Sequence, residues 1–342
     1  MINIIVDAMG GDNAPDAIID GCIEAIKMQD GFNITLVGKT DVIQKVLDKN
    51  EFNKDRIVIV NATEVIEGKD TPTKAIRAKK DSSMVVGLKL LKGKKGDAFI
   101  SAGNTGALMT GALLLVGRIK GIDRPSISAL VPSMKGMTLI IDAGMNTVCR
   151  PINYLQFAMM GSIYMKLLYK LESPKIGLLN VGSEYAKGND TIKQAFELLS
   201  TAPVNFVGNI EGNDITRGDV DVAVCDGYVG NVSLKLYEGV GSLFLKELKK
   251  IFLKNILTKI CYLILNSAFK DFKKKFDPDE LSGAPVLGIK ELVIKSHGSS
   301  KAKTIRSTIL KRALPLIQNG IVNEIKNQFK ETEVKPANDD ID

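Results

Sequence analysis

The run Ala98-Phe99-Ile100-Ser101-Ala102-Gly103-Asn104-Thr105-Gly106-Ala107 decides the fold class of this chain, because a short apolar run opens into a loop of small residues and then into a helix-like segment. The N-terminus of a helix leaves backbone N–H groups unpaired, and glycines let a ligand approach the backbone, so this order predicts an anion site. The loop has neither the Lys-Ser/Thr pair of a Walker motif nor a G-x-G-x-x-G pattern. A tight strand-to-helix connection without a ligand therefore remains the alternative.

Short runs rich in valine and isoleucine alternate with helix-period segments along most of the chain. The predicted strands cover residues 2–6, 34–37, 57–60, 97–100, 138–141, 176–181, 204–207 and 220–225, and the predicted helices include 15–29, 72–91 and 188–200. This alternation predicts an α/β fold of three layers, α/β/α, with a mostly parallel sheet covered on both faces. Residues 283–297 predict two strands around Gly288, and 299–329 predict a long closing helix.

Polar loops of small residues follow many of these strands. They are Asp7–Asn13, Ser101–Gly106, Asp142–Asn146, Val181–Asn189, Gly208–Gly212 and Cys225–Asn231. Ligands of parallel sheets bind at the carboxyl ends of the strands, so we expect these loops to form one site on one rim. No internal repeat or linker divides the chain, which predicts a single α/β domain over residues 1–329 and a polar, disordered tail over 330–342.

The inventory of reactive side chains excludes several classes of site. The chain has one histidine, His297, and four widely separated cysteines without C-x-x-C spacing. A histidine-rich metal site and a Ser-His-Asp triad away from His297 are therefore excluded, and we predict no metal, no zinc site and no disulfide framework. The chain opens directly as a strand, without the basic start of a secretory signal, so we expect a cytoplasmic protein.

The basic charge is concentrated in residues 243–276, which hold nine lysines and two acids and so account for the net charge of +7 of the whole chain. Apolar residues recur there at helical spacing with lysines beside them, and the fully apolar run 260–265 is too short to span a bilayer. We predict a basic amphipathic helical segment that contacts the membrane surface or a carrier protein. Its contact residues are Lys254, Leu257, Ile260, Leu263 and Ile264.

Two alternatives for this segment stay open, an apolar stripe packed in a dimer interface and lysines that dock an acidic protein. Nucleic acid is not an expected partner, because no aromatic-rich basic platform accompanies the lysines.

Five motifs together resemble one family. They are Asp7-Ala8-Met9-Gly10-Gly11-Asp12, Ser101–Ala107, Gly208–Gly212, Asp226-Gly227-Tyr228-Val229-Gly230-Asn231 and His297-Gly298-Ser299-Ser300. Their order and combination resemble phosphate acyltransferase, the acyl-carrier-protein:phosphate acyltransferase of bacterial phospholipid synthesis, over residues 1 to about 325.

The resemblance implies transfer of a long-chain acyl group from acyl-acyl-carrier protein to inorganic phosphate, by direct attack of phosphate on the thioester. It also implies a fold like that of isocitrate/isopropylmalate dehydrogenases and related to phosphotransacetylases, a homodimer, and peripheral attachment to the inner face of the membrane. No cofactor is implied. The acyl phosphate would feed glycerol-3-phosphate acylation, which makes a glycerol-3-phosphate acyltransferase a further expected partner.

This reaction needs positioned cations and hydrogen-bond donors more than acid–base groups, because hydrogen phosphate is already a nucleophile and a thiolate is a tolerable leaving group. By resemblance, Lys187 pairs with phosphate, Asn231 donates to the oxyanion, and His297 passes a proton to the leaving thiolate. Further phosphate or substrate contacts are expected from Gly103, Asn104, Thr105, Gly106, Gly227 and Gly230.

Structural roles compete with some of these assignments. Asn231 could be the N-cap of the following helix, and His297 could hold a turn. Asp7, Asp12 and Asp142 are expected to orient or cap. Cys225 has no electropositive neighbours that would activate a thiolate, which disfavours an acyl-enzyme.

Three other functions are weighed against acyl transfer from carrier protein. The main alternative is a phosphotransacetylase-type enzyme that uses short-chain acyl-CoA. A dehydrogenase of the same fold is disfavoured because the chain lacks a G-x-G-x-x-G loop and a cluster of acids spaced for a divalent metal. A non-catalytic scaffold is disfavoured by the intact loops around Lys187 and Asn231.

Overall fold

Eleven strands form one sheet in the order β3-β2-β1-β4-β11-β10-β5-β6-β9-β7-β8, which confirms the predicted α/β class. The computed structural model describes residues 1–331, apart from the side chains at 270, 271, 273–275, 278, 280 and 331. The strands are β1 (Ile2–Asp7), β2 (Phe32–Gly38), β3 (Ile57–Asn61), β4 (Ala98–Ser101), β5 (Ser126–Ser133), β6 (Gly136–Ile141), β7 (Lys175–Leu179), β8 (Asn205–Ile210), β9 (Val222–Val224), β10 (Ala284–Leu287) and β11 (Leu292–Lys295).

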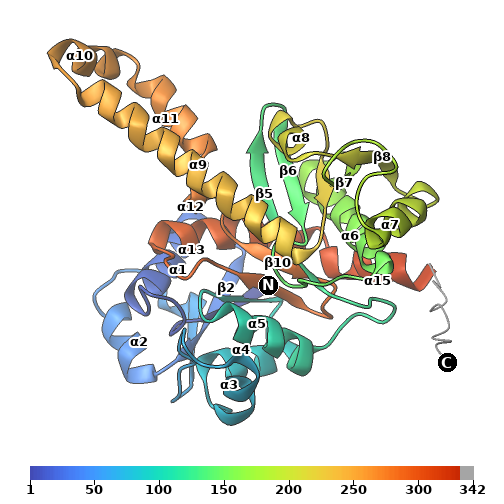
Figure 1. Ribbon diagram of the computed structural model, residues 1–342. Helices are drawn as coiled ribbons and strands as arrows, with labels where there is room; N and C mark the ends of the chain where they lie inside the picture. Colours follow the sequence, from blue (N-terminus) through green and yellow to red (C-terminus); the bar gives the residue numbers. More distant parts are fainter. Residues whose placement is uncertain (332–342) are drawn as a thin grey trace.

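Helices cover both faces of this sheet (Figure 1). They are α1 (Asp16–Met28), α2 (Thr40–Leu47), α3 (Pro72–Ala78), α4 (Ser83–Lys92), α5 (Thr105–Gly111), α6 (Pro151–Tyr169), α7 (Asp190–Ser200), α8 (Gly212–Arg217), α9 (Gly227–Leu253), α10 (Ile256–Ile264), α11 (Asn266–Lys275), α12 (Pro278–Leu281), α13 (Ala302–Thr308), α14 (Leu314–Gln318) and α15 (Ile321–Glu331). Short 3₁₀ or π turns lie at Lys54–Arg56, Ala112–Val116 and Ile309–Ala313.

Alternation along the strands produces the three layers. On β1, Ile4 and Val6 pack with α1, α13 and α6 in one apolar cluster that extends under both halves of the sheet. Ile5, between them, points to the opposite face and packs with α4 and α5. Successive side chains of a strand point to opposite faces, so fully apolar strands require helices on both sides.

The sheet consists of two parallel groups that run in opposite directions, a feature the sequence did not predict. Strands β3, β2, β1, β4 and β11 form one group, and β6, β9, β7 and β8 form the other. The antiparallel strands β10 and β5 join them, and β5 pairs with β10 only through Ser126 and Ile127. The carboxyl ends of β6 and β11 therefore lie at the same level of the sheet, with β10 and β5 between them. The expected single rim is two rims that meet at the middle of the sheet.

Two predicted helices differ in detail from the structure, and one strand was missed. The helix expected over 72–91 is two helices, α3 and α4, and the closing helix expected over 299–329 is α13, α14 and α15 with a π turn. Gly320 has φ of +65°, a left-handed conformation that ends α14 and starts the new direction of α15. Strand β5 was not predicted. The part of the predicted tail from residue 332 onward lies outside the described residues.

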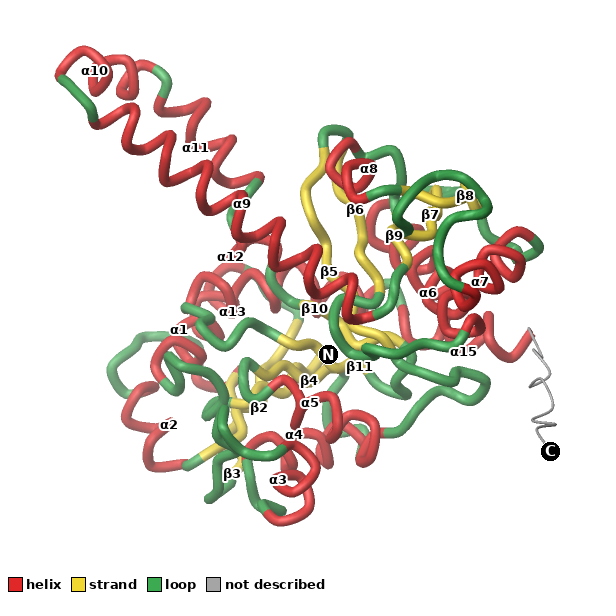
Figure 2. Tube along the Cα trace, in the orientation of Figure 1, coloured by secondary structure: helices red, strands yellow, loops and turns green. Residues whose placement is uncertain are grey.

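Residues 243–276 form the outer part of an arm that projects from the body (Figures 1 and 2). The long helix α9 leaves the junction of the two strand groups, α10 forms the tip, and α11 runs back beside α9. None of the helices described within residues 1–331 is long and apolar enough to cross a bilayer.

One buried carboxylate shapes the loop where the two groups meet. Asp142, directly after β6, accepts hydrogen bonds at Oδ1 from the backbone N–H groups of Ile127, Gly144 and Met145, at 3.1–3.2 Å. Its Oδ2 accepts from the backbone and side-chain nitrogens of Asn146, both at 2.7 Å. Burial raises the pKa of this carboxyl, and the donated hydrogen bonds oppose the rise. The role of orienting group predicted for Asp142 is the one that this geometry provides.

We predict that Asp142→Asn lowers the free energy of unfolding by about 1–3 kcal/mol, because an amide NH₂ would face backbone donors where a carboxylate oxygen accepts. Urea unfolding measures the change. Asp219→Asn is the matched control, since Asp219 pairs with Lys135 at the exposed surface and its loss should cost less than about 1 kcal/mol. Equal stability of Asp142→Asn and the wild-type chain would contradict this role.

Candidate active site

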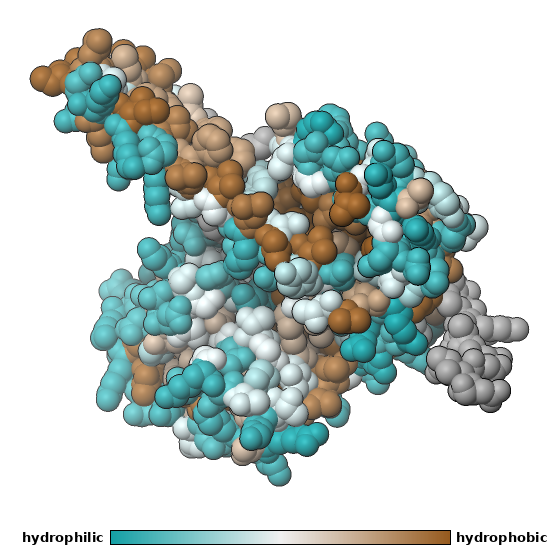
Figure 3. Space-filling model, in the orientation of Figure 1, coloured by the Kyte–Doolittle hydropathy of each residue, from teal (hydrophilic) through white to brown (hydrophobic). Residues whose placement is uncertain are grey.

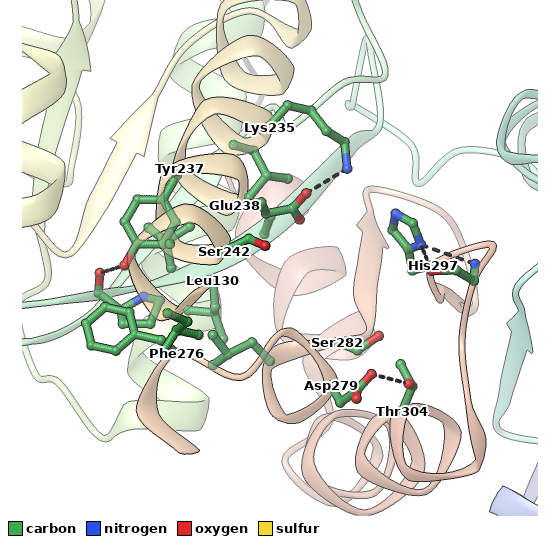
Figure 4. A pocket seen from close by; sticks show the side chains of 18 of the residues that line it. Leu130, Lys235, Tyr237, Glu238, Ser242, Phe276, Asp279, Ser282, His297 and Thr304 are labelled. Carbon is green, nitrogen blue, oxygen red and sulfur yellow. Dashed lines mark hydrogen bonds and ion pairs between the residues drawn. The ribbon is translucent and has the colours of Figure 1, made fainter. Parts of the chain in front are cut away.

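A cavity of about 860 Å³ lies where the two strand groups meet and continues along the arm. At its inner end the lining residues come from loops of both groups and from the start of α9 (Figure 4). These residues are Thr105, Ala143, Gly144, Asn231, Lys235, Lys295, His297, Ser299 and Ser300. The structure thus brings together three of the predicted site residues, Thr105, Asn231 and His297.

His297 presents one ring nitrogen to its own turn. Its Nδ1 lies 2.8 Å from Ser299 Oγ and 3.2 Å from the backbone nitrogen of Ser299. Since that N–H can only donate, we assign Nδ1 as an acceptor, which places the proton of the neutral ring on Nε2. In Figure 4 the ring nitrogen that does not contact Ser299 faces the open side of the cavity. His297 can therefore hold the turn and still offer an N–H to a ligand.

Cations and burial act on this histidine. Burial lowers the pKa of His297 below its ordinary value, and the nearby Lys295 and Lys235 lower it further. The ring is therefore neutral at pH 7, and its Nε2–H is a donor that carries no charge of its own.

Lys295, the last residue of β11, is a half-buried cation in the same cavity. Its ammonium forms no hydrogen bond or ion pair with any residue that the structure describes. Burial lowers the pKa of Lys295, and the charge of Lys235 adds to the effect. By contrast, Lys235 is paired with Glu238 at 2.7 Å. An ammonium removed from water without a partner is costly, so an anion bound beside Lys295 would lower that cost.

Asn231 lies inside α9 and is not its N-cap, so the alternative role considered from the sequence is wrong. Asp226 caps the helix by accepting from the backbone nitrogen of Val229 at 2.8 Å. The Asn231 Nδ2 donates to the carbonyl oxygen of Ala143 at 3.3 Å, which ties α9 to the loop shaped by Asp142. One further hydrogen of that NH₂ group remains for a ligand.

The loop after β4 contributes less directly than its motif suggests. Asn104 caps α5 through its Oδ1, and its Nδ2 lies 3.0–3.1 Å from the carbonyl oxygens of Glu67, Gly68 and Asp70. The Gly103 nitrogen donates to Ser101 Oγ at 3.1 Å, and Gly106 packs against Pro72. Thr105 alone of this group lines the cavity. Phosphate contacts by Gly103, Asn104 and Gly106 stay predictions.

Gly227 and Gly230 allow two chain segments to approach closely. A Cβ atom on Gly230 would lie 1.9 Å from the carbonyl oxygen of Asp142, and one on Gly227 would lie 2.7 Å from the nitrogen of Asn146. The Gly227 nitrogen donates to the carbonyl oxygen of Asn146 at 2.7 Å. These glycines seat the start of α9 on the Asp142 loop, and their contact with substrate stays a prediction.

Lys187 is exposed and is not among the cavity-lining residues. It lies in the loop between β7 and α7, where its carbonyl oxygen accepts from Asn180 Nδ2 at 3.1 Å. Lys187 therefore lies outside the cavity, and its contact with phosphate stays a prediction.

Three further residues, Cys225, Asp7 and Asp12, lie near the junction as groups that could react covalently or orient the site. Cys225 is buried, burial raises the pKa of its thiol well above the ordinary value, and it does not line the cavity. Asp7 is buried and accepts from Ser101 Oγ at 2.7 Å, which ties the ends of β1 and β4 together as predicted for an orienting group. The backbone nitrogen of Asp12 donates to Gly298 at 2.8 Å and so links the first loop to the histidine turn.

Sequence reasoning missed Lys295 and Lys235 as site residues. Lys295 precedes Ser296-His297 at the end of an apolar run, a position at the carboxyl edge of a strand that could have identified it. Nothing in the sequence distinguishes Lys235 from the many lysines that follow it.

The chain is similar to known proteins over nearly its whole length. Residues 2–323 match the family model described as "Fatty acid synthesis protein". A phosphate acyltransferase from Acetivibrio thermocellus is 56% identical over 338 residues, 99% of each chain. One from Thermoanaerobacter pseudethanolicus is 47% identical over 329 residues, 96% of this chain and 98% of the relative. A phosphotransacetylase from Streptococcus pyogenes shares the fold, with a TM-score of 0.61 at 15% identity over 93% of this chain and 94% of that one.

We predict that the single histidine titrates below the ordinary value of about 6.5, because burial and two lysines disfavour the imidazolium. One histidine gives one C2–H resonance, so proton NMR across pH measures its pKa directly. Lys295→Met should raise that pKa, since it removes a neighbouring positive charge. A titration at or above the ordinary value in the wild-type chain, or no change in the variant, would contradict the described electrostatics.

Proposed function

The chain belongs to the phosphate acyltransferase family, and we propose that it transfers a long-chain acyl group from acyl-acyl-carrier protein to inorganic phosphate. The observation that carries this proposal is one cavity with two chemical ends. The inner end offers an ammonium that pairs with no described residue, together with neutral donors. The outer end along the arm is lined by leucine and aromatic side chains, with Ser242, Lys246 and Lys249 beside them. A phosphate and an acyl chain are the substrates that these ends fit.

Phosphate is proposed to bind beside Lys295. A dianion there would give the half-buried ammonium a partner that no described residue provides, and charge-assisted hydrogen bonds are about twice as strong as neutral ones. Thr105 lines the same end and can add a hydroxyl contact. Lys187 remains a separate prediction as a second phosphate cation, acting from the loop outside the cavity.

The chemical step forms one bond and breaks one. A phosphate oxygen attacks the thioester carbonyl carbon, the carbonyl oxygen becomes an oxyanion, and the C–S bond then breaks to release the carrier-protein thiolate. The free N–H of Asn231 and the Nε2–H of His297 are the proposed donors to the oxyanion or the departing sulfur. The buried Cys225 supports direct attack, because a thiol with a raised pKa outside the cavity is a poor nucleophile.

The tip of the arm is proposed to contact the inner face of the membrane. Leu257, Leu263 and Ile264 on α10 are each at least 70% exposed, and Lys254 and Lys259 lie in the same region. Figure 3 shows the hydrophobic surface that covers the tip. An apolar surface with adjoining lysines fits a membrane with anionic lipids better than it fits water.

A second copy of the chain is the partner that we propose for the outer face of α9. Val232, Leu236, Val240, Leu243 and Phe244 form an exposed apolar stripe there at helical spacing. Two such stripes would cover each other in a homodimer. Sedimentation velocity measures the mass of the particle in solution and so tests this.

We predict that Lys295→Met raises KM for phosphate and lowers kcat/KM for phosphate by about 10- to 100-fold, the loss of one charged hydrogen bond. KM for acyl-carrier protein should be unchanged. Acyl phosphate trapped as a hydroxamate gives the rates. Lys290→Met, which removes an exposed lysine near the start of β11, is the matched control. Unchanged phosphate dependence in Lys295→Met would contradict the assignment, and Lys187→Ala in the same assay tests the loop lysine.

We predict that Leu263→Glu releases the chain from vesicles that contain anionic lipid, by at least about tenfold in partitioning, since burying a leucine contributes about 1.5–3 kcal/mol. Vesicle flotation measures binding, and turnover of soluble acyl-carrier protein should be kept. Met134→Glu changes an apolar residue that is also exposed, on the turn between β5 and β6, and should float like wild type. Undiminished flotation of Leu263→Glu would contradict membrane contact by α10.

A further inference from the structure

The cavity extends from its polar end along the inner face of α9. This part of the cavity is lined by residues of α9 at intervals of three, four or seven, namely Leu234, Gly241, Leu245, Leu248 and Phe252. That spacing places all of them on one side of the helix. This inner stripe is distinct from the outer stripe proposed to meet a second copy. The arm therefore has two apolar faces, and one of them belongs to the cavity.

Aromatic side chains from the returning segment close the far end. Phe252 of α9 packs against Phe269 of α11 with ring centroids 4.5 Å apart and against Tyr262 of α10 at 5.6 Å. Tyr262 and Phe269 are 5.8 Å apart, and all three line the cavity. Phe276 and Leu281 form part of the opposite wall nearer the body.

The length of this channel can be compared with a fatty acyl chain. Helix α9 rises about 1.5 Å per residue, so Phe252 lies about 26–31 Å along the helix from Lys235 and Asn231. An extended chain advances about 1.2 Å per bond, judged from the reach of an extended backbone, so sixteen carbons span about 18 Å. The channel therefore holds a whole sixteen- or eighteen-carbon chain and ends one or two helical turns beyond its methyl group.

We propose that the inner face of the arm is the acyl-chain channel of this enzyme, kept open by Gly241 and closed by Phe252, Tyr262 and Phe269, so that the arm sets the upper limit of acyl-chain length. The inference rests on the proposed acyl transfer, which puts the thioester at the polar end of the same cavity. The acyl chain of the substrate would thus lie inside the arm, along α9, while the tip of the arm contacts the membrane.

Gly241 is the position where this channel can be blocked. A Cβ atom on Gly241 would meet no described atom within 4 Å, and the residue lines the cavity, so a larger side chain there would project into the channel. Gly239, two residues earlier, also has nothing within 4 Å but is exposed and does not line the cavity. The same substitution at these two glycines changes helix propensity equally and differs in the face that receives the side chain.

The test compares Gly241→Leu with Gly239→Leu in the full-length chain. Acyl phosphate is measured as hydroxamate from octanoyl-, dodecanoyl- and hexadecanoyl-carrier protein. Gly241 lies about 9–15 Å along α9 from Lys235 and Asn231, so a block there leaves room for about eight to twelve carbons. Gly241→Leu should lose at least tenfold in kcat/KM on hexadecanoyl-carrier protein and keep octanoyl turnover within twofold. Gly239→Leu should keep the wild-type profile.

Several outcomes overturn the channel. One is an unchanged chain-length profile in Gly241→Leu. Another is an equal loss of kcat/KM at every acyl-chain length in a variant whose melting temperature is unchanged. If Gly241→Leu is unstable, Leu245→Phe, deeper in the channel, should shorten the preferred chain, and an unchanged profile there overturns the proposal too. Failure of the acyl-transfer function itself looks different, because the wild-type chain would then give no acyl phosphate at any length.

Discussion

The buried carboxylate of Asp142 is the constraint on which the site depends. It collects hydrogen-bond donors from the start of β5 and from its own loop, and that loop seats the N-terminal end of α9 and Asn231. Because β5 pairs with β10 through only two residues, the hydrogen bonds to Asp142 add to the shared apolar cluster in fixing how the two strand groups meet. A carboxylate that only accepts is suited to this place, since every atom pointed at it donates.

The cavity that results separates charge from apolar surface along one helix. Its inner end holds an ammonium that pairs with no described residue and a histidine kept neutral by burial and by neighbouring lysines. Its outer end is lined mainly by leucine and aromatic side chains of the arm, with Ser242, Lys246 and Lys249 beside them. A cavity with one charged end and one apolar end suits transfer of an acyl group to phosphate, because one substrate is a compact dianion and the other carries a long hydrocarbon. The same arm supplies a wall of the cavity, an exposed apolar stripe and an apolar tip.

The alternation of strands and helices could be predicted well from the sequence. The way the two strand groups join, and the residues that meet there, could not. Apolar runs such as 2–6 and 97–100 are strands, because residues buried on both faces of a parallel sheet leave a continuous signal. Strand β5 was missed because it is antiparallel and broken by serines and Pro132. Thr105, Asn231 and His297 were placed in one site from their motifs, but the motif of Asn104 reflects capping and clamping. Lys295 is important because it is half-buried and has no described partner. Neither property can be read from the sequence alone.

The donor of the acyl group is the most direct test of the account. Inorganic phosphate is supplied with palmitoyl-carrier protein, palmitoyl-CoA or acetyl-CoA, and acyl phosphate is trapped as its hydroxamate. The account predicts product that depends on phosphate and comes from palmitoyl-carrier protein in preference to acetyl-CoA. Product formed chiefly from acetyl-CoA would contradict it in favour of a phosphotransacetylase activity, and absence of product from every donor would contradict acyl transfer altogether.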